Sequence, residues 1–424
     1  MNVQLQLQNQ VVVPPVIDAP PSKSAAHRLL IPAALAHEET LIRCAGTSDD
    51  IQRTADCLTQ MGAQITRLAD GETFCVKPIR LPQGLCHLHV GESGSTLRFL
   101  LPVLGALGIQ AHIHMCGRLP QRPLEPLAGE LTRHGMTLSF IQPDVLSVSG
   151  KLSAGTYTLD GSVSSQFISG LLFALPLLKE ESRLQITGKV ESLPYIQMTL
   201  NALAQFGVRP ASSETGFTVF PTPYVTQKHY EVEGDYSGAA FMLCAGALHP
   251  AGVCVRGLDP ASPQGDRKIL QILRDLGAEV RQENGLTHVH PAPLHGISLD
   301  VSHIPDLMPV LAVVTATARG ETRFYNAGRL RLKESDRLAA CAGLLHTLGI
   351  RTEESEDSLL VYGASLQSGV CDGCSDHRMV MSAALACLVI DRPLTVTTAQ
   401  AVSKSYPAFF DDLRKFGVCV TPLS

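Results

Sequence analysis

The hydrophobic and polar positions of the chain follow a pattern that recurs six times. In each copy, an amphipathic helical segment ends in Leu, three further residues and Gly, and a short run of β-type residues follows. The glycines are Gly62, Gly135, Gly207, Gly277, Gly349 and Gly417, which lie 68 to 73 residues apart. A glycine after a helical pattern usually ends the helix in the left-handed conformation. The nearly constant period predicts one supersecondary unit repeated along the chain.

A second marker with the same period lies at the starts of long apolar segments. One Ser or Asp per repeat precedes such a segment, at intervals of 69 to 72 residues: Ser24, Ser95, Ser165, Ser237, Asp306 and Asp376. Because Ser and Asp are preferred N-caps, we expect these residues to cap helices. The segments that follow, such as 97–107 and 307–318, are apolar on nearly every side, which is typical of buried helices.

Each repeat is therefore expected to hold one buried helix, one amphipathic helix and several short strands. Strand candidates are 156–159, 184–187 and 394–397. This composition predicts an α/β fold. Six units of about seventy residues favour two domains of three repeats each over one closed object.

The domain boundaries are expected before the first buried helix and between the third and fourth repeats. One domain would comprise residues 22–232 and the other residues 1–21 plus 233–424, with a hinge near Pro20-Pro21. We expect the strand 11–17 to pair with the last strand, near 418–420. That pairing would hold both ends of the chain in one domain.

Composition narrows the possible functions. The chain has 424 residues and is 45% hydrophobic, enough for large cores. A net charge of −5, 5% aromatic residues and no Trp argue against a nucleic-acid partner. The N-terminus has no signal-peptide pattern, and no uninterrupted apolar stretch is long enough to cross a membrane, so we expect a cytoplasmic protein. We also expect a monomer. The 12 cysteines are scattered, as reduced thiols are.

The polar residues of interest gather at helix starts. They open the apolar segments (Lys23, Ser24 and Arg28; Gly94; Ser164, Ser165 and Gln166; Asp306; Arg378) and the amphipathic ones (Arg122; Ser192; Lys333, Glu334 and Arg337; Lys404). Helix starts favour anions through free N–H groups and the helix dipole. If the helix starts of both domains face each other, they form an interdomain cleft of positive potential that suits a small polyanion.

Residues 331–337 open an amphipathic segment, 338–348. In a first helical turn, Lys333 and Arg337 would lie on one face with Glu334 beside them. Taken alone, this segment is more simply a capped surface helix with solvated charges. Helix capping explains the Ser and Asp residues of the other clusters, but it does not explain the cations that accompany them. Taken together, the clusters therefore favour a functional site.

The residue types indicate the chemistry. Ser164, Ser165 and Gln166 suit a phosphate and ring hydroxyls, whereas separated arginines suit bidentate contacts with carboxylate or phosphate. Asp306 and Glu334, among cations, could act as base and acid, each worth roughly 10²–10⁴ in rate. Lys23 is not in a nucleotide P-loop motif. Nothing in the sequence calls for a metal or an organic cofactor.

Several motifs together resemble the 3-phosphoshikimate 1-carboxyvinyltransferase family, also called 5-enolpyruvylshikimate-3-phosphate (EPSP) synthases. The matching segments are Pro21-Ser22-Lys23-Ser24, Gln121-Arg122-Pro123, 160–167, Pro194-Tyr195, Ile304-Pro305-Asp306, 332–337 and Asp376-His377-Arg378-Met379. The resemblance runs from about residue 16 to residue 410. It implies two domains, each of three βαβαββ-type units around buried parallel helices, which close on the substrates.

The resemblance also implies the reaction. Such enzymes transfer the enolpyruvyl group of phosphoenolpyruvate to the 5-hydroxyl of shikimate 3-phosphate and release phosphate. The family works by addition and elimination through a tetrahedral intermediate, without a cofactor. The product leads to chorismate and the aromatic amino acids.

By position, the resemblance assigns roles to the residues. Asp306 and Glu334 would be catalytic, and Lys23 would assist and touch both substrates. Shikimate 3-phosphate would be held by Lys23, Ser24, Arg28, Ser164, Ser165, Gln166, Ser192, Asp306 and Lys333. Phosphoenolpyruvate would be held by Lys23, Gly94, Arg122, Gln166, Arg337, Arg378 and Lys404. The family's inhibitor glyphosate would bind beside Gly94.

The chain departs from the family pattern at Arg329, where many members have Asn, at Leu193, where many have Lys, and at Ser95, where Thr is common. Two alternatives stay open at this point. One is the sister enzyme that transfers enolpyruvyl to UDP-N-acetylglucosamine, which usually has Lys-Asn where this chain has Lys23-Ser24. The other is a non-catalytic anion-binding protein on the same scaffold, which would be expected to lose Asp306 or Glu334.

Overall fold

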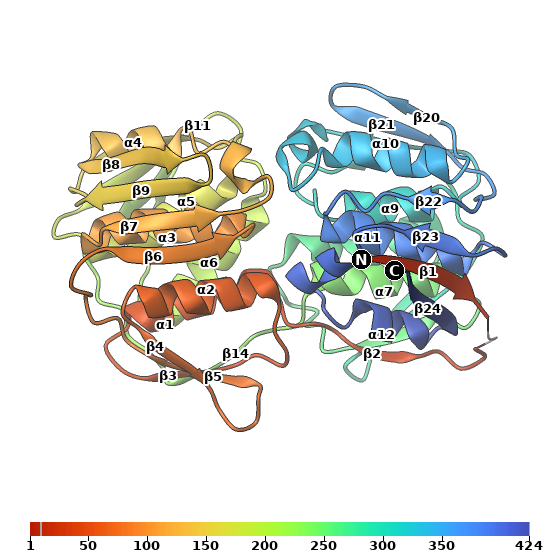
Figure 1. The fold of residues 1–424 in the computed structure, drawn as a ribbon, viewed down its shortest axis with the longest axis horizontal. Coiled ribbons are helices and arrows are strands. Elements are labelled where there is room, and N and C mark those ends of the chain that lie inside the picture. The colour runs from red at the N-terminus through yellow and green to blue at the C-terminus, as the bar shows by residue number, and fades with distance from the viewer. Residues whose placement is uncertain (9–10, 424) are drawn as a thin grey trace. The chain divides into compact units, whose positions relative to one another are not determined.

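The computed structural model describes residues 1–8 and 11–423, and the chain divides into two compact units (Figure 1). The central unit comprises Lys23–Val232, and the terminal unit comprises Met1–Ser22 together with Glu233–Ser424. Each unit has its own cluster of buried apolar side chains. We describe the two units separately.

All sheets in the described part of the chain share one order, in which a parallel pair is followed by two antiparallel neighbours. The central unit has three such sheets: β14 (His229–Glu231), β3 (Thr40–Arg43), β5 (Thr73–Lys77), β4 (Gln64–Arg67); β6 (Cys86–Gly91), β7 (Ala111–Met115), β9 (Val145–Gly150), β8 (Met136–Gln142); and β10 (Thr156–Asp160), β11 (Ser182–Thr187), β13 (Gly216–Val219), β12 (Ala211–Ser213).

The terminal unit repeats this arrangement. Its sheets are β2 (Val16–Asp18), β15 (Val253–Arg256), β17 (Leu286–His290), β16 (Glu279–Glu283); β18 (Ser298–Asp300), β19 (Glu321–Tyr325), β21 (Ser358–Tyr362), β20 (Thr352–Glu354); and β22 (Val370–Cys371), β23 (Leu394–Val396), β1 (Asn2–Leu7), β24 (Val418–Leu423). Each repeat is thus a βαβαββ unit, as expected, and the predicted strands near 156, 184 and 394 are confirmed.

The first helix of each repeat is buried. These helices are α1 (Lys23–Leu35), α3 (Gly94–Leu107), α5 (Ser165–Ala174), α7 (Tyr236–Leu248), α9 (Met308–Thr315) and α11 (His377–Leu385). In four repeats this helix connects the two parallel strands of one sheet, whereas α1 leads from β2 to β3 and α7 leads from β14 to β15, which are strands of different sheets. In α7 every residue except Leu248 is buried. Close packing has a local cause at Gly170, where an added Cβ would lie 2.2 Å from the Arg98 carbonyl oxygen. This glycine therefore lets α5 approach α3.

The second helix of each repeat is shorter or more amphipathic. These helices are α2 (Asp49–Gln60), α4 (Leu127–Arg133), α6 (Leu193–Gln205), α8 (Ile269–Leu276), α10 (Arg337–Thr347) and α12 (Phe409–Arg414). Short 3₁₀ turns are η1 (Leu119–Gln121), η2 (Leu175–Leu177), η3 (Gly265–Lys268), η4 (Gly328–Leu332), η5 (Ala386–Leu388) and η6 (Ala399–Lys404). All six repeat glycines have positive φ, from 79° to 112°, so the predicted left-handed helix ends are confirmed.

The predicted caps are mostly wrong by one or two residues. Of the six expected N-caps, only Asp376 caps its helix with its side chain. Ser93, Ser164 and Asp235 cap α3, α5 and α7 instead. Each of these capping residues precedes the predicted residue by one or two positions. Ser95, Ser165 and Ser237 are consequently displaced into the first helical turn, and Asp306 lies before α9, whose N-cap is Leu307.

The predicted pairing of strand 11–17 with the last strand is also wrong. The partner of β24 is β1, with Leu5 opposite Val420 and Leu7 opposite Val418. β1 has a polar face, and only its residues Val3 and Leu5 are buried. Its sequence pattern therefore did not indicate a strand. The segment 16–18 forms β2, which pairs in parallel with β15.

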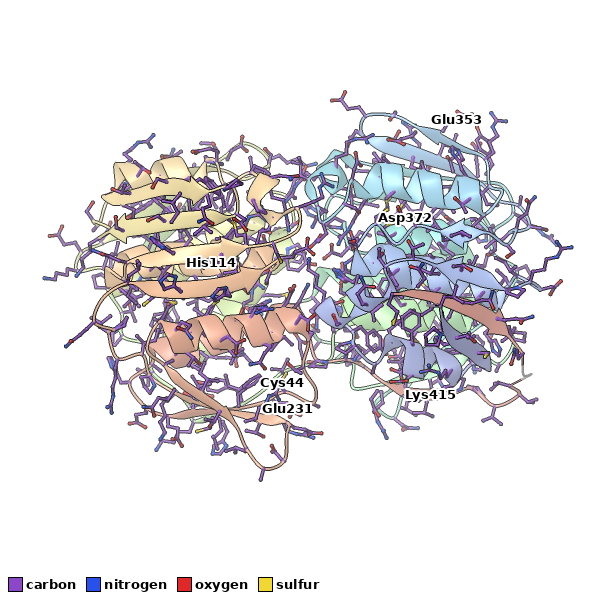
Figure 2. All side chains as sticks on the ribbon, in the orientation of Figure 1. Cys44, His114, Glu231, Glu353, Asp372 and Lys415 are labelled. Carbon is purple, nitrogen blue, oxygen red and sulfur yellow. The ribbon has the colours of Figure 1, made fainter. Side chains whose placement is uncertain are left out.

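Four histidines gather on the outer face of β6 and β7 in the central unit. His87 lies opposite His112 and His89 opposite His114, and the His89 and His114 rings stack with centroids 4.5 Å apart. Partial burial and the other three histidines lower the pKa of His114, which is labelled in Figure 2. Protonation of His114 is therefore disfavoured.

His27, in α1, is a second histidine whose pKa is lowered in the folded chain. Its ring is 0% exposed, and its Nδ1 lies 2.7 Å from the Thr54 hydroxyl. Burial lowers the pKa of His27 to about 3. Unfolding exposes the ring and restores its ordinary value of about 6.5. Between these values only the unfolded chain binds the proton, so His27 reduces stability as pH falls below about 6.5.

We therefore expect acid to destabilise the wild-type chain more than a His27→Gln variant. The excess loss should approach about 1.4 kcal/mol per pH unit below about pH 6.5. Urea unfolding monitored between about pH 7.5 and pH 4.5 measures it. Parallel losses in the two proteins would contradict the assignment.

Candidate active site

A buried arginine at the start of α10 is the centre of the polar cluster in the terminal unit. The side chain of Arg337 is 1% exposed, and its guanidinium contacts three carboxylates. Its Nε lies 2.8 Å from Asp376, and its two terminal nitrogens lie 2.7 Å from Asp306 and 2.8 Å from Glu334. A buried charge is tolerated only when it is paired and hydrogen-bonded, and this guanidinium meets that condition.

Asp306 is in contact with further cations. Its carboxylate lies 3.5 Å from the Lys333 Nζ and 3.3 Å from Arg378, which also donates to the Asp306 carbonyl oxygen. Burial opposes ionisation, but Arg378, Lys333 and Arg337 together hold the pKa of Asp306 well below its ordinary value. The carboxylate is therefore charged before any substrate binds.

Lys333 shows the opposite balance. Burial lowers the pKa of its ammonium to about 8, although the nearby Asp306 and Glu334 carboxylates favour the charged form. Lys333 therefore remains mostly charged at neutral pH. An anion placed beside it would raise this pKa toward its ordinary value, because an opposite charge favours the ionised form.

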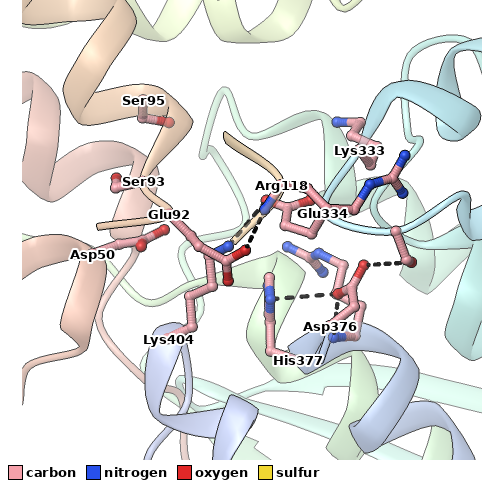
Figure 3. Close-up of polar contacts among 12 residues, drawn as sticks. Asp50, Glu92, Ser93, Ser95, Arg118, Lys333, Glu334, Asp376, His377 and Lys404 are labelled. Carbon is pink, nitrogen blue, oxygen red and sulfur yellow. Dashed lines mark hydrogen bonds and ion pairs between the residues drawn. The ribbon is translucent and has the colours of Figure 1, made fainter. Parts of the chain in front are cut away.

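Glu334 lies between two cations. It receives a hydrogen bond from Arg337, and the Lys404 Nζ lies 3.6 Å from its other oxygen. Figure 3 shows the Lys404 side chain extending from the end of η6 toward Glu334. Both side chains are largely buried.

Asp376 was not among the predicted site residues, yet its carboxylate holds the Arg337 guanidinium in position. It is fully buried, caps α11 by accepting from the Arg378 N–H at 2.9 Å, and receives the Ser335 hydroxyl at 3.0 Å (Figure 3). It therefore links Arg337 and Arg378, two of the predicted arginines. The signal in the sequence was its place in the Asp376-His377-Arg378 motif.

The predicted helical placement of Lys333 and Arg337 is wrong. Lys333 follows η4 with extended backbone, and α10 begins only at Arg337. Asp336 caps that helix by accepting from the Ala339 N–H at 3.1 Å, which excludes the preceding residues from the helix. Lys333 and Arg337 still meet, but through the Asp306 carboxylate and not along a helix face.

The central unit holds the other predicted residues. Lys23 opens α1, and its Nζ forms an ion pair of 2.9 Å with Asp50, which sequence reasoning missed. Arg28 is buried one turn further on and donates to the Thr199 hydroxyl, the Tyr195 carbonyl and the Ser24 carbonyl. Burial lowers the pKa of Arg28 to about 10, so it stays charged at neutral pH.

The starts of α3 and α5 are joined by Gln166. Its amide oxygen accepts from Arg98 at 2.7 Å, and its amide nitrogen donates to Ser95 at 2.9 Å. Ser164 caps α5 and accepts from the Gln166 N–H, with Ser165 next in the chain. Gln166 thus links the start of α5, where Ser164 and Ser165 lie, to the start of α3.

Gly94 is the first residue of α3, and it has a steric role. An added Cβ would lie 2.9 Å from a terminal nitrogen of Arg122. The absence of a side chain at Gly94 therefore lets the Arg122 guanidinium lie beside the start of α3. A helix start is also a position where anions bind well. Ser192, the N-cap of α6, has a left-handed backbone at φ 54°, which is unusual for a residue with a side chain.

Other kinds of site are not apparent in the described residues. Among residues 1–8 and 11–423, no group of three or more His, Cys, Asp or Glu is placed to hold a metal ion. In the same residues, no helix combines the length and apolar character needed to span a membrane.

Two solved structures share the fold of this chain. A solved structure of the enolpyruvyl transferase NikO from Streptomyces tendae matches with a TM-score of 0.78 at 18% identity, over 99% of this chain and 98% of that one. A structure of EPSP synthase from Acinetobacter baumannii matches with a TM-score of 0.82 at 23% identity, over 100% of both chains.

The sequence comparisons identify the family. The model of EPSP synthase (3-phosphoshikimate 1-carboxyvinyltransferase) matches residues 8–413. The 3-phosphoshikimate 1-carboxyvinyltransferases of Clostridium kluyveri and Clostridium acetobutylicum are each 38% identical, over 95% of this chain and 94% of theirs. The chain belongs to the EPSP synthase family.

The Arg337 centre yields a stability prediction. Replacing Arg337 with Met leaves three neighbouring carboxylates without their shared cation, and we expect a loss of about 3–5 kcal/mol in unfolding free energy. Arg351 is a matched control, since its ion pair with Glu353 is exposed and Arg351→Ala should change stability by less than about 1 kcal/mol. Urea unfolding measures both. A small loss for Arg337→Met would show that the carboxylates do not depend on it.

Proposed function

We propose that Asp306 and Glu334, assisted by Lys23, carry out the reaction of this family in this chain. The enzyme is a transferase that moves the enolpyruvyl group of phosphoenolpyruvate to the 5-hydroxyl of shikimate 3-phosphate and releases phosphate. This reaction belongs to the shikimate pathway of aromatic amino acid biosynthesis. The observation that carries the residue assignment is the convergence of Asp306 and Glu334 on Arg337.

Asp306 is the proposed base. The cations that suppress its basicity, Arg378, Lys333 and Arg337, are also proposed to bind the anionic groups of the substrates. When a substrate phosphate or carboxylate shares these cations, it weakens their hold on the carboxylate, and the pKa of Asp306 rises. Substrate binding thus makes Asp306 a stronger base at the moment when it is needed.

The chemistry divides into addition and elimination. In the addition, the 5-hydroxyl oxygen bonds to the central carbon of phosphoenolpyruvate as its double bond to the methylene carbon opens, and Asp306 takes the hydroxyl proton. Glu334, which enters this step in its protonated form, gives its proton to the methylene carbon. In the elimination, Glu334 takes a proton back from the new methyl group as the carbon–oxygen bond to phosphate breaks. The proton held by Asp306 is then available for the departing phosphate, with help from Lys23. Protons balance over the cycle, and the steps use only side chains of this chain.

The remaining residues are proposed to bind. Hydroxyl and amide groups at the starts of α1, α5 and α6 suit the phosphate and ring hydroxyls of shikimate 3-phosphate: Ser24, Ser164, Ser165, Gln166 and Ser192, with Arg28 and Lys333. Phosphoenolpyruvate carries a carboxylate and a phosphate, which suit the separated cations Lys23, Arg122, Arg337, Arg378 and Lys404 and the open helix start at Gly94.

The alternatives are less well supported. Family membership favours shikimate 3-phosphate over UDP-N-acetylglucosamine as the acceptor. A purely anion-binding protein has no need of two carboxylates among its cations, since each one opposes the binding of an anion. Asp306 and Glu334 therefore support catalysis over binding alone.

The proposed role of Asp306 predicts a separation of catalysis from binding. In Asp306→Ala, kcat should fall by at least about 10², the usual contribution of a positioned general base. The affinity for shikimate 3-phosphate, measured by calorimetry, should change only a few-fold. Equal losses of kcat and affinity would instead make Asp306 a structural residue.

The contact at Gly94 predicts a change confined to one substrate. In Gly94→Ala the new methyl group displaces the Arg122 guanidinium, so KM for phosphoenolpyruvate should rise about tenfold, which corresponds to about 1.4 kcal/mol. The KM for shikimate 3-phosphate should change little. Gly343→Ala on α10 is the matched control, because an added Cβ there meets nothing within 4 Å. A tenfold rise for both substrates would contradict a specific role of Arg122.

A further inference from the structure

A chain of buried polar side chains runs from α1 through α2 to the start of α3, and the proposed mechanism does not use it. Its four members, His27, Thr54, Thr96 and Ser93, are each 0% exposed. The His27 Nδ1 lies 2.7 Å from the Thr54 hydroxyl, which lies 2.7 Å from the Thr96 hydroxyl. The Thr96 hydroxyl donates to the Ser93 hydroxyl at 2.7 Å. A buried network whose members satisfy one another holds its elements in one arrangement.

These contacts determine the direction of the chain. A Thr hydroxyl has one proton, and Thr96 gives its proton to Ser93, so Thr96 can only accept in its contact with Thr54. Thr54 therefore donates to Thr96 and must accept from His27. The donor is the Nδ1–H group, so the single proton of the neutral imidazole lies on Nδ1.

The other ring nitrogen of His27 supports this tautomer. Nε2 is buried, and no described residue forms a hydrogen bond with it. Buried N–H groups without an acceptor are rarer in proteins than buried acceptors without a donor, so Nε2 is the nitrogen that lacks the proton. Because burial lowers the pKa of His27 to about 3, the ring is neutral at neutral pH and carries one proton.

The chain ends on the residue that begins α3. Ser93, labelled in Figure 3, is the N-cap of this helix and accepts from the Thr96 N–H as well as from its hydroxyl. Gly94 follows, and a Cβ added there would lie 2.9 Å from a terminal nitrogen of Arg122. A displacement of Ser93 would therefore move the helix start that lies against the Arg122 guanidinium.

The other end of the chain lies one turn inside α1 and α2. Lys23 and Asp50 form an ion pair of 2.9 Å at the starts of these two helices. His27 and Thr54 each come four residues later and meet one helical turn deeper. The two helices are thus joined twice, and the second contact continues to α3. The chain therefore fixes the start of α1, with Lys23, relative to the start of α3.

The residue after His27 is bonded to a different helix. Arg28 donates to the Thr199 hydroxyl at 2.8 Å and to the Tyr195 carbonyl at 3.1 Å, and both acceptors belong to α6. The N-cap of α6 is Ser192, which is proposed to bind shikimate 3-phosphate. Neighbouring residues of α1 thus connect it to two helix starts with different proposed ligands.

We infer that His27, Thr54 and Thr96 are positioning residues for phosphoenolpyruvate, because their hydrogen-bond chain holds the start of α3 in place relative to the start of α1. This inference rests on the proposed binding of phosphoenolpyruvate by Lys23 and Arg122. Its consequence is that breaking the chain lowers the affinity for phosphoenolpyruvate. The affinity for shikimate 3-phosphate is retained, because the contacts of α1 with α6 stay intact.

The test removes one hydroxyl from the chain of the full-length enzyme and keeps the size of the side chain. In Thr96→Val, KM for phosphoenolpyruvate should rise about three- to tenfold, the effect of one hydrogen bond. The kcat and the KM for shikimate 3-phosphate should change little. Thr96→Ser keeps the hydroxyl and should restore a KM close to that of the wild type. Thr54→Val breaks the same chain, should give the same result, and replaces Thr96→Val if that variant does not fold.

Thr199→Val is the matched control, because Thr199 is also 0% exposed and accepts from Arg28 on the other side of α1. It should show the opposite pattern, with a raised KM for shikimate 3-phosphate and little change for phosphoenolpyruvate. A general loss of stability would affect both substrates in both variants. Equal increases of the two KM values in Thr96→Val, or no rescue by Thr96→Ser, would overturn the inference.

The tautomer of His27 gives a readout that needs no substrate. Nitrogen NMR of the protein labelled with ¹⁵N-histidine distinguishes a protonated from an unprotonated ring nitrogen, and His27→Gln identifies the two resonances of His27. We expect the proton on Nδ1 in the wild type, and a shift of the Nδ1 resonance in Thr96→Val. A proton on Nε2 would contradict the direction of the chain and overturn the inference.

Gly94→Ala separates this inference from the proposed function. If Gly94→Ala raises KM for phosphoenolpyruvate and Thr96→Val does not, the start of α3 binds that substrate but the buried chain does not position it. If neither variant raises this KM, the proposed role of the start of α3 is itself wrong, and the inference fails with it.

Discussion

The terminal unit depends on one requirement, that a buried guanidinium must be matched by buried carboxylates. Arg337 meets Asp306, Glu334 and Asp376, and these come from the starts of three different helices. Desolvating one such charge costs several kcal/mol unless its partners are well placed. The chain satisfies this requirement with the same charges that we propose to bind the anionic substrates.

The repeat supplies the placement. Each βαβαββ unit carries its polar residues at helix starts, and the helices themselves have few charged residues inside the core. Asp306, Glu334 and Asp376 then meet because the fifth and sixth repeats pack side by side in one unit. The same organisation in the central unit joins Lys23 to Asp50 and Gln166 to Arg98.

Much of the fold was predictable because its signals are local. The Leu-x-x-x-Gly period marks helix ends, and the left-handed glycines follow from the same pattern. The exact caps were not predictable where two polar residues compete, as Ser93 and Ser95 do at α3. The strand β1 was not predicted because only two of its residues, Val3 and Leu5, are buried.

The residues of the candidate site were predictable as types, whereas their pairings were not. Hydroxyls, amides and cations at helix starts were evident in the sequence. The contacts of Arg337 with Asp376 and of Lys23 with Asp50 join residues that are 39 and 27 positions apart, so only tertiary packing determines them.

We propose that Glu334, a carboxylate held by Arg337, moves the proton at the methylene carbon of phosphoenolpyruvate. The most direct measurement is deuterium incorporation from D₂O into that carbon during turnover, comparing the wild type with Glu334→Gln. We expect label in the wild-type product and in recovered phosphoenolpyruvate, and at least about 10²-fold slower incorporation in the variant while both substrates still bind. Incorporation at the wild-type rate in Glu334→Gln would contradict it.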